Sequence, residues 1–355
     1  MNELKTLIAA ASSLHTGDAP YLSATVVRVL GSAYRKPGAR MLATAERWVA
    51  GSISAGCLER DVLSRGMWRL RDGRPVLVRY DASEDALDEW QGSGCQGVID
   101  VLLEPGASHA YDAYGFAAKC LETETAGVIA TVFASEHAAI EVSAKLLISR
   151  EAVTGTINDP ALRTWLSAEA HEGGPARVVT REGVTALIEP VVLPPHLFIF
   201  GGNHDVGPLA SLARNLGWSV SLWDGQTRKR AENFGDYLTG SAEAAVLRLN
   251  ACARPIAVVM THDLQRDQEV LSALLPSRAQ YIGVLGPRRR TEQLLARCAR
   301  PGAGQLSGRL FGPAGLAIGS ETPAEIALSI VAQVQSVLTA TADHTHRSFP
   351  RASGY

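Results

Sequence analysis

Residues 196–217 read HLFIFGGNHDVGPLASLARNLG, and this segment is the most informative one for the fold. It predicts an apolar strand that runs into glycines, followed by a helix that ends at Gly217. Further along the chain, the apolar runs SVSLW, PIAVVM and YIGVLG predict strands, with helices near 267–275, near 288–299 and from about Pro323 to Leu338. Strands that alternate with helices predict a Rossmann-type, doubly wound parallel sheet over residues 196–342, with residues 343–355 as a flexible tail.

The chain before this segment follows a different pattern, and Pro190, Pro194 and Pro195 separate the two parts. Short strands mixed with helices predict an α+β domain over residues 1–190, and hence an α/β protein as a whole. Strands are expected at 23–30, 40–43, 75–80, 98–103, 127–134 and 184–188, and helices at 3–14, 57–71, 111–123 and 161–171. Two strands end alike, as GVIDVLLEP (97–105) and GVTALIEP (183–190), which we interpret as similar strand exits and not as a repeat.

The composition is that of an ordinary globular protein with room for two domains. The chain has 355 residues, 46% of them apolar and 20% charged, with a formal net charge of −2. This charge gives no reason to expect nucleic acid or an anionic membrane as a partner. No apolar run approaches the roughly 18 residues of a membrane span. The five cysteines form no CxxC pair, so we expect a cytoplasmic protein with free thiols.

In a parallel sheet of this kind, ligands bind beyond the carboxyl ends of the strands. The loop Gly201–Gly207 would place backbone amides and a helix N-terminus against a phosphate, so Gly201, Gly202, Asn203 and His204 are candidate cofactor-binding residues. Only the first glycine of the G-x-G-x-x-G dinucleotide fingerprint is in place, because Asn203 stands at the second position. A Rossmann domain that binds no dinucleotide is the open alternative.

Three further features lie at the same predicted edge. Asp224 ends the second strand, where an acid can accept hydrogen bonds from ribose hydroxyls. Arg288, in the run 288–290, is a candidate phosphate ligand, and a solvated first helical turn is its alternative. The loop Thr261–Asp263 follows the strand PIAVVM and is a third candidate loop.

The first half contains a basic turn, GSAYRKPGARM (31–41), in which Arg35, Lys36 and Arg40 are candidate ligands of phosphate or carboxylate. Its alternative is a solvated turn. The segment GSISAGCLERDV (51–62) places Cys57 in the first turn of a helix, where the helix dipole favours a thiolate and Glu59 partly opposes it.

Cys95 lies in a second glycine-rich loop, QGSGCQG (91–97), which suits the exposure of a sulfur atom to a ligand. For both Cys57 and Cys95, the alternative is a small buried side chain. The remaining cysteines, Cys120, Cys252 and Cys298, are expected in the core.

Six ordered segments together resemble the XdhC/CoxI family, accessory factors of xanthine dehydrogenase and related molybdenum hydroxylases. These segments are GSAYRKPGARM, GSISAGCLERDV, GSGCQGVIDVLLEP, FIFGGNHDVGPLA, YIGVLGPRRR and GLAIGSETPAEIALSIVA. The resemblance implies a protein that binds molybdenum cofactor, supports its sulfuration and hands it to the apo-enzyme. It makes Cys57 and Cys95 the candidates for contacting molybdenum or carrying sulfur. At the first Rossmann turn, the chain departs from the family's usual glycine by having Asn203.

The leading hypothesis is therefore a cofactor chaperone in which Arg35, Lys36 and Arg40 hold the pterin phosphate and Cys57 and Cys95 face the metal. A molybdenum hydroxylase such as xanthine dehydrogenase and a cysteine desulfurase are the expected partners, and a homodimer the expected assembly. The chain lacks the cysteine-rich iron–sulfur motifs of xanthine dehydrogenase itself.

Two alternatives come from other classes of protein. One is an NAD(P)-dependent oxidoreductase in which Asp224 contacts the ribose and His204 serves as acid or base. The other is a structural assembly factor whose Rossmann half has no ligand.

Overall fold

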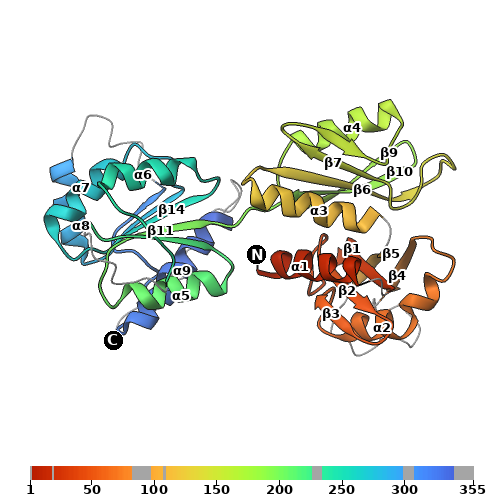
Figure 1. Cartoon of the computed structure of the whole chain (residues 1–355), viewed down its shortest axis with the longest axis horizontal. Coiled ribbons are helices and arrows are strands. Elements are labelled where there is room, and N and C mark those ends of the chain that lie inside the picture. The colour runs from red at the N-terminus through yellow and green to blue at the C-terminus, as the bar shows by residue number, and fades with distance from the viewer. Residues whose placement is uncertain are drawn as a thin grey trace. The chain divides into compact units, whose positions relative to one another are not determined.

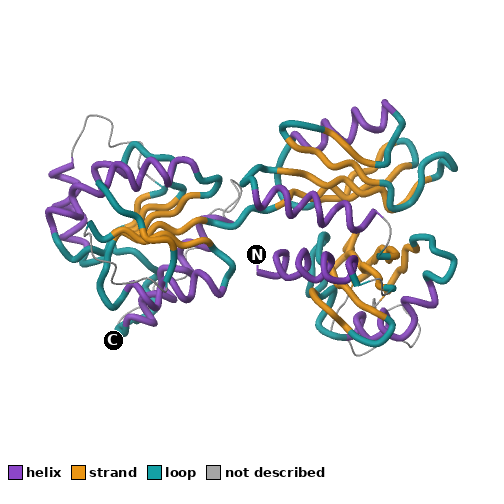
Figure 2. The backbone as a smooth tube through the Cα atoms, in the orientation of Figure 1, coloured by secondary structure: helices purple, strands orange, loops and turns teal. Residues whose placement is uncertain are grey.

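The computed structural model describes most of the chain, and its residues fall into two compact units that are treated separately below (Figures 1 and 2). Unit 1 is Met1–Leu193 and unit 2 is Pro194–Tyr355. The described residues are 2–17, 20–81, 97–106, 109–225, 234–298 and 308–339. The tail predicted at 343–355 and residues 91–96 of the second cysteine loop, with Cys95, lie outside them.

Unit 1 is built from two repeats with the same order of elements. The first repeat contains α1 (Asn2–Thr16), β1 (Tyr21–Gly31), β2 (Arg40–Thr44), β3 (Trp48–Gly51), α2 (Cys57–Arg69), β4 (Val76–Asp81) and β5 (Gly97–Pro105). The second repeat contains α3 (His109–Glu122), β6 (Gly127–Ser135), β7 (Lys145–Ser149), β8 (Val153–Gly155), α4 (Pro160–His171), β9 (Arg177–Arg181) and β10 (Val184–Val191). Each repeat forms an antiparallel sheet, with strand orders β3-β2-β1-β5-β4 and β8-β7-β6-β10-β9.

The two sheet orders correspond strand for strand, so the segments 97–105 and 183–190 are equivalent strands of the two repeats. The interpretation that these similar endings do not reflect a repeat is therefore wrong. The expected helices and strands of this half are present, whereas β3, β7, β8 and β9 were not predicted. These missed strands are short, with three to five residues each, and so carry little periodic signal.

The repeats agree in backbone detail as well as in topology. Gly38 N donates a hydrogen bond to Val26 O at 2.8 Å, and Ser143 N donates to Val132 O at 2.7 Å. Gly38 and Ser143 both have positive φ, 96° and 75° respectively. A non-glycine residue seldom adopts this conformation, so its retention at Ser143 indicates that the turn before the second strand is required in both copies.

Two buried ion pairs join the repeats at equivalent positions. Arg40, the first residue of β2, pairs with Glu189 of β10, and Lys145, the first residue of β7, pairs with Glu104 of β5. The Lys145 and Glu104 side chains are only 4% and 3% exposed, and those of Arg40 and Glu189 are 9% and 16% exposed. Each glutamate precedes the proline in the shared Glu-Pro ending. These endings therefore carry the contact between the two copies.

A small apolar cluster also holds the two sheets together. It consists of Val27 and Leu102 from the first repeat and Phe133 and Leu187 from the second, each at most 1% exposed. The strand register skips Val27 in β1 and Phe133 in β6, so each copy has an irregularity at the same place. The two repeats consequently share buried surface and form one unit.

Unit 2 has six parallel strands with helices on both faces (Figure 1). Its elements are β11 (His196–Phe200), α5 (Val206–Asn215), β12 (Ser219–Trp223), β13 (Asp236–Tyr237), α6 (Ala242–Ala251), β14 (Pro255–Val259), α7 (Leu264–Leu274), β15 (Tyr281–Val284), α8 (Arg288–Cys298), β16 (Leu310–Phe311) and α9 (Pro323–Thr339). One apolar core lies under α6, α7 and α8, and a second lies under α5 and α9. The predicted parallel sheet is confirmed.

The strand order of this sheet is β13-β12-β11-β14-β15-β16. Successive strands after β11 are added on one side of it as far as β13, and from β14 onward on its other side. The carboxyl ends of β11 and β14 therefore form the switch point where such folds bind ligands. Among the described helices, none is both long enough and apolar enough to cross a membrane.

Candidate functional site

Cys57 is the first residue of α2 and is partly exposed. The helix is anchored below it because Leu58 and Val62 are buried in the core of the first repeat. Gly56 precedes the thiol with φ at 118°, a conformation that favours glycine. Cys57 Sγ lies 3.6 Å from Ser54 Oγ. The other described cysteines are all buried: Cys120, Cys252 and Cys298.

The Glu59 carboxylate holds the loop in front of this thiol. Its Oε1 accepts hydrogen bonds from Ile53 N at 2.9 Å and Ser54 N at 2.7 Å. Its Oε2 accepts from Gly56 N at 3.0 Å and from Ser54 Oγ. Burial by itself would raise the pKa of Glu59, but hydrogen bonds from Ser54 and the loop amides outweigh it and lower the pKa below 4.5. Glu59 therefore stays ionised and fixes the loop that presents Cys57.

The three cations of the basic turn have different surroundings. Arg40 is buried against Glu189, whose charge outweighs burial and raises the pKa of Arg40 further above its ordinary value. Arg35 donates from Nη2 to both carboxylate oxygens of Glu3, at 2.7 and 2.6 Å. Lys36 is exposed. Arg40 thus has a structural role that the sequence pattern did not reveal, and Lys36 is the cation that faces solvent.

The basic turn and the start of β5 are in direct contact. Gly31 pairs with Gly97 in the sheet, and a Cβ atom on Gly97 would lie 2.8 Å from the carbonyl oxygen of Ser32. Cys57 packs against the apolar core of this same sheet. Cys95 lies outside the described residues, so the idea that its sulfur shares a ligand with Cys57 stays a prediction.

In unit 2, the first turn after β11 is tightly packed at its start and exposed further on. A Cβ atom on Gly201 would lie 2.6 Å from the carbonyl oxygen of Met260, so glycine is needed there for strand packing. Asn203 and His204 are exposed. The turn therefore presents two side chains where a dinucleotide-binding turn would present bare backbone.

Asp224 directly follows β12, close to its predicted place, but the residue is only 5% exposed. Burial and a hydrogen bond with the Asp224 carboxylate raise the pKa of Tyr237. A Cβ atom on Gly202 would lie 2.7 Å from Asp224 Cβ, which brings the first turn close to this acid. The carboxylate that we expected to contact a ribose is therefore already engaged by a neighbouring tyrosine.

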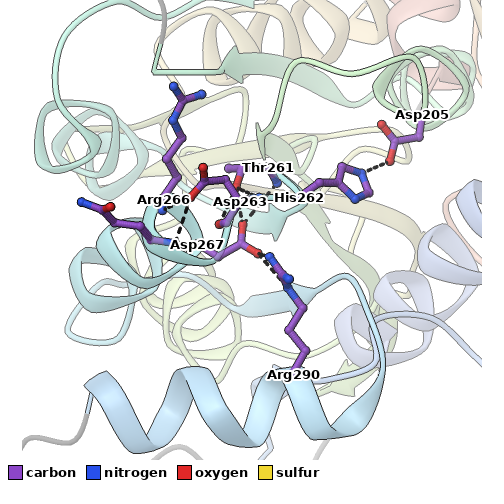
Figure 3. Close-up of polar contacts among 8 residues, drawn as sticks. Asp205, Thr261, His262, Asp263, Arg266, Asp267 and Arg290 are labelled. Atoms are coloured by element: carbon purple, nitrogen blue, oxygen red, sulfur yellow. Dashed lines mark hydrogen bonds and ion pairs between the residues drawn. The ribbon is translucent and has the colours of Figure 1, made fainter.

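The arginines at the start of α8 also differ from one another. Arg288 is 83% exposed and pairs with Glu292 at 3.0 Å. Arg290 binds the buried carboxylate of Asp267 with Nη2 at 2.8 Å, and Thr261 Oγ1 donates to the same carboxylate at 2.6 Å (Figure 3). The Asp267 network was missed from sequence, although an acid on the buried face of α7, beside Val270, Leu271 and Leu274, was a signal for it.

A histidine–aspartate pair bridges the switch point. His262 comes after β14, and Asp205 comes after β11. His262 Nε2 lies 2.6 Å from Asp205 Oδ2 (Figure 3). His262 has φ at 60°, a left-handed conformation that is uncommon for a residue other than glycine. Asp205 is the N-cap residue of α5, yet its side chain caps no backbone amide. A cavity of about 320 Å³ opens beside this pair.

Two family models match the chain. Residues 14–81 match the model described as the XdhC and CoxI family. Residues 197–334 match the model described as the XdhC Rossmann domain. The first match contains Cys57 and the basic turn, and the second contains the switch point.

Similar proteins extend over nearly the whole chain. A Bacillus subtilis (strain 168) protein, named as a probable xanthine dehydrogenase subunit, is 32% identical over 316 residues, which are 88% of this chain and 91% of that protein. A crystal structure titled as a xanthine dehydrogenase from Bacillus halodurans superimposes with a TM-score of 0.75 at 30% identity, over 97% of this chain and 98% of that one. The Escherichia coli (strain K12) protein YqeB, named as uncharacterized, is 30% identical over 40% of this chain and 27% of its own length.

Proposed function

The chain belongs to the XdhC and CoxI family, and on that premise we propose that it is an accessory factor of a xanthine dehydrogenase or a related molybdenum hydroxylase. In this role it binds molybdenum cofactor, supports its sulfuration and delivers it to the client enzyme. The names of the Bacillus subtilis and Bacillus halodurans relatives support the link to xanthine dehydrogenase. A cysteine desulfurase as sulfur donor, a homodimer and a cytoplasmic location are parts of the same proposal.

The observation that carries the proposal is the presentation of Cys57. Its thiol is partly exposed at a helix N-terminus, on a loop that Glu59 holds through four hydrogen bonds. Sulfur is a soft donor, which suits a molybdenum centre or a persulfide. The donor chemistry of this loop therefore fits the cofactor, and a second thiol from Cys95 would complete the pair.

The cofactor is cargo in this proposal, and the chain's own residues hold it. Cys57 contacts the metal end, and Lys36 attracts the phosphate of the pterin. Arg35 and Arg40 direct their charge to Glu3 and Glu189, so they support the turn rather than the ligand. The redox chemistry of the bound cofactor belongs to the client enzyme.

The alternative of an NAD(P)-dependent oxidoreductase has less support. Asp205 places a carboxylate at the N-terminus of α5, where the pyrophosphate of a dinucleotide would bind. His204 is exposed, the Asp205 carboxylate is paired with His262 instead, and Asp224 is engaged by Tyr237. NAD(P) or another nucleotide stays a predicted ligand of unit 2 that this geometry disfavours.

The proposal is tested by measuring cofactor retention. The full chain is mixed with molybdenum cofactor and passed through a gel-filtration column, and molybdenum per chain is measured by mass spectrometry. Cys57→Ala combined with Cys95→Ala should lower retention at least tenfold, whereas Cys298→Ala should retain the wild-type amount because its sulfur is buried in unit 2. Wild-type retention by the double variant would refute the roles assigned to the two thiols.

A further inference from the structure

The cavity beside His262 lies at the place where a parallel sheet binds its ligand. It opens between the first turn after β11 and the start of α9, over the carboxyl ends of β14 and β15. Its volume of about 320 Å³ falls within the usual range for small-molecule sites. The cofactor-handling role of unit 1 makes no use of it.

The walls of the cavity are mostly apolar. Leu209 of α5, Met260 after β14, Leu285 after β15, and Ile326 and Ile330 of α9 line it. Such walls stabilise the body of a ring compound by removing it from water. They offer nothing to a chain of phosphates.

The polar end of the cavity contains hydrogen-bond acceptors beside Asn203 and His204, whose side chains can also donate. Asp205 and Glu321 contribute carboxylates. Asp205 Oδ1 is buried, and it has no hydrogen-bond partner within the described part of the chain. His262 also lines the cavity, and its Nε2 is engaged with Asp205 Oδ2. A ligand that supplies N–H donors would match the carboxylates at this end of the cavity.

Charge decides against an anionic ligand. The Asp205 side chain is only 13% exposed, and both Asp205 and Glu321 line the cavity. A phosphate brought beside Asp205 would meet repulsion that solvent screens little, whereas the exposed Glu321 would repel it more weakly. We propose that this cavity binds an uncharged heteroaromatic compound with an N–H donor, of nucleobase to nucleoside size, and that it discriminates against nucleotides and dinucleotides.

Isothermal titration calorimetry on the full chain tests this proposal with adenine, adenosine, AMP and NAD⁺ as probes. Adenine or adenosine should bind, and AMP and NAD⁺ should bind at least tenfold more weakly than adenosine. Ile326→Trp places a ring in the cavity and should lower adenosine affinity at least tenfold. Leu328→Trp is the matched control, because Leu328 lies on the same helix, is 51% exposed and does not line the cavity. The Leu328→Trp variant should bind adenosine with wild-type affinity.

The charge argument has its own variant. Asp205→Asn keeps the size of the side chain and removes its charge, so the preference for adenosine over AMP should fall toward equality. Thermal melts would accompany each titration to confirm that the variants are folded. The proposal is overturned if neither adenine nor adenosine binds, if AMP or NAD⁺ binds as tightly as adenosine, or if Ile326→Trp leaves adenosine binding unchanged in a folded chain.

Discussion

Lys145→Met should be among the most destabilising single substitutions in unit 1. The substitution leaves the Glu104 carboxylate, which is 3% exposed, without its direct ion-pair partner, while the Ser143 hydroxyl still donates to it and Arg40 still interacts with it electrostatically. Removing one partner of a buried ion pair costs about 3–5 kcal/mol. At about 2–4 °C per kcal/mol for a domain of this size, the melting temperature of unit 1 should fall by roughly 6–20 °C.

Differential scanning calorimetry and urea unfolding of the full chain measure this loss. Arg181→Met is the control, because the Arg181–Glu182 pair is 57% and 76% exposed and an exposed pair contributes about 0–1 kcal/mol. The double variant Lys145→Met with Glu104→Leu removes both charges, so it should recover most of the stability lost by Lys145→Met alone. A loss below about 1 kcal/mol for Lys145→Met, or a double variant as unstable as the single one, would refute the assignment of this pair as the contact between repeats.

Three further predictions follow from the same structure. The pKa of Glu59 is lowered in the folded chain, so its stabilising contribution is present above pH 4.5 and is lost as the pH falls through the pKa of the folded state. In urea unfolding measured at several pH values, Glu59→Gln should therefore make the free energy of unfolding depend less on pH on the acid side. Asp267→Asn should lower the free energy of unfolding of unit 2 by about 1–3 kcal/mol in calorimetry, since it weakens the bond to Arg290, and a smaller loss than this would contradict the role of the network. Gly155→Ala should fail to give a stable fold by circular dichroism, because its Cβ would lie 2.1 Å from a backbone oxygen. Gly173 also has positive φ but has open space around it, so Gly173→Ala should lower the free energy of unfolding by only about 1–2 kcal/mol. Equal losses at the two glycines would mean that the close contact is not limiting.

The fold of unit 2 could be predicted because its signals are local. The central strands β11, β14 and β15 are buried on both faces, so they appear in the sequence as apolar runs such as LFIF or IAVV. Gly201 and Gly217 then mark the turn and the helix end within a few residues of these runs. Neighbouring residues alone were enough to identify the four main strands and their order, whereas α6 and the two-residue edge strands β13 and β16 were not predicted.

The switch-point pair could not be predicted, because it depends on a contact between distant residues. His262 and Asp205 are 57 residues apart, and neither has a local pattern that names the other. The sequence pointed to the loop Thr261–Asp263 and to the first turn as two separate candidates. Only the adjacency of β11 and β14 in the sheet brings them together, and that adjacency is a property of topology rather than of composition.

The basic turn shows why a repeat should be sought before a ligand is assigned. Arg40 appeared to be one of three clustered cations, and its cluster suggested phosphate. Its equivalent in the second repeat is Lys145, which begins a strand without a comparable cluster of cations and still pairs with a glutamate from the other copy. Both repeats therefore keep a cation at this position, although only Arg40 has other cations nearby. The contact with a glutamate, which both copies share, explains why the cation is there. The Glu-Pro endings at 104–105 and 189–190 were the half of that contact that the sequence showed, because they mark the two glutamates as equivalent, and only the fold adds the cation that each one binds.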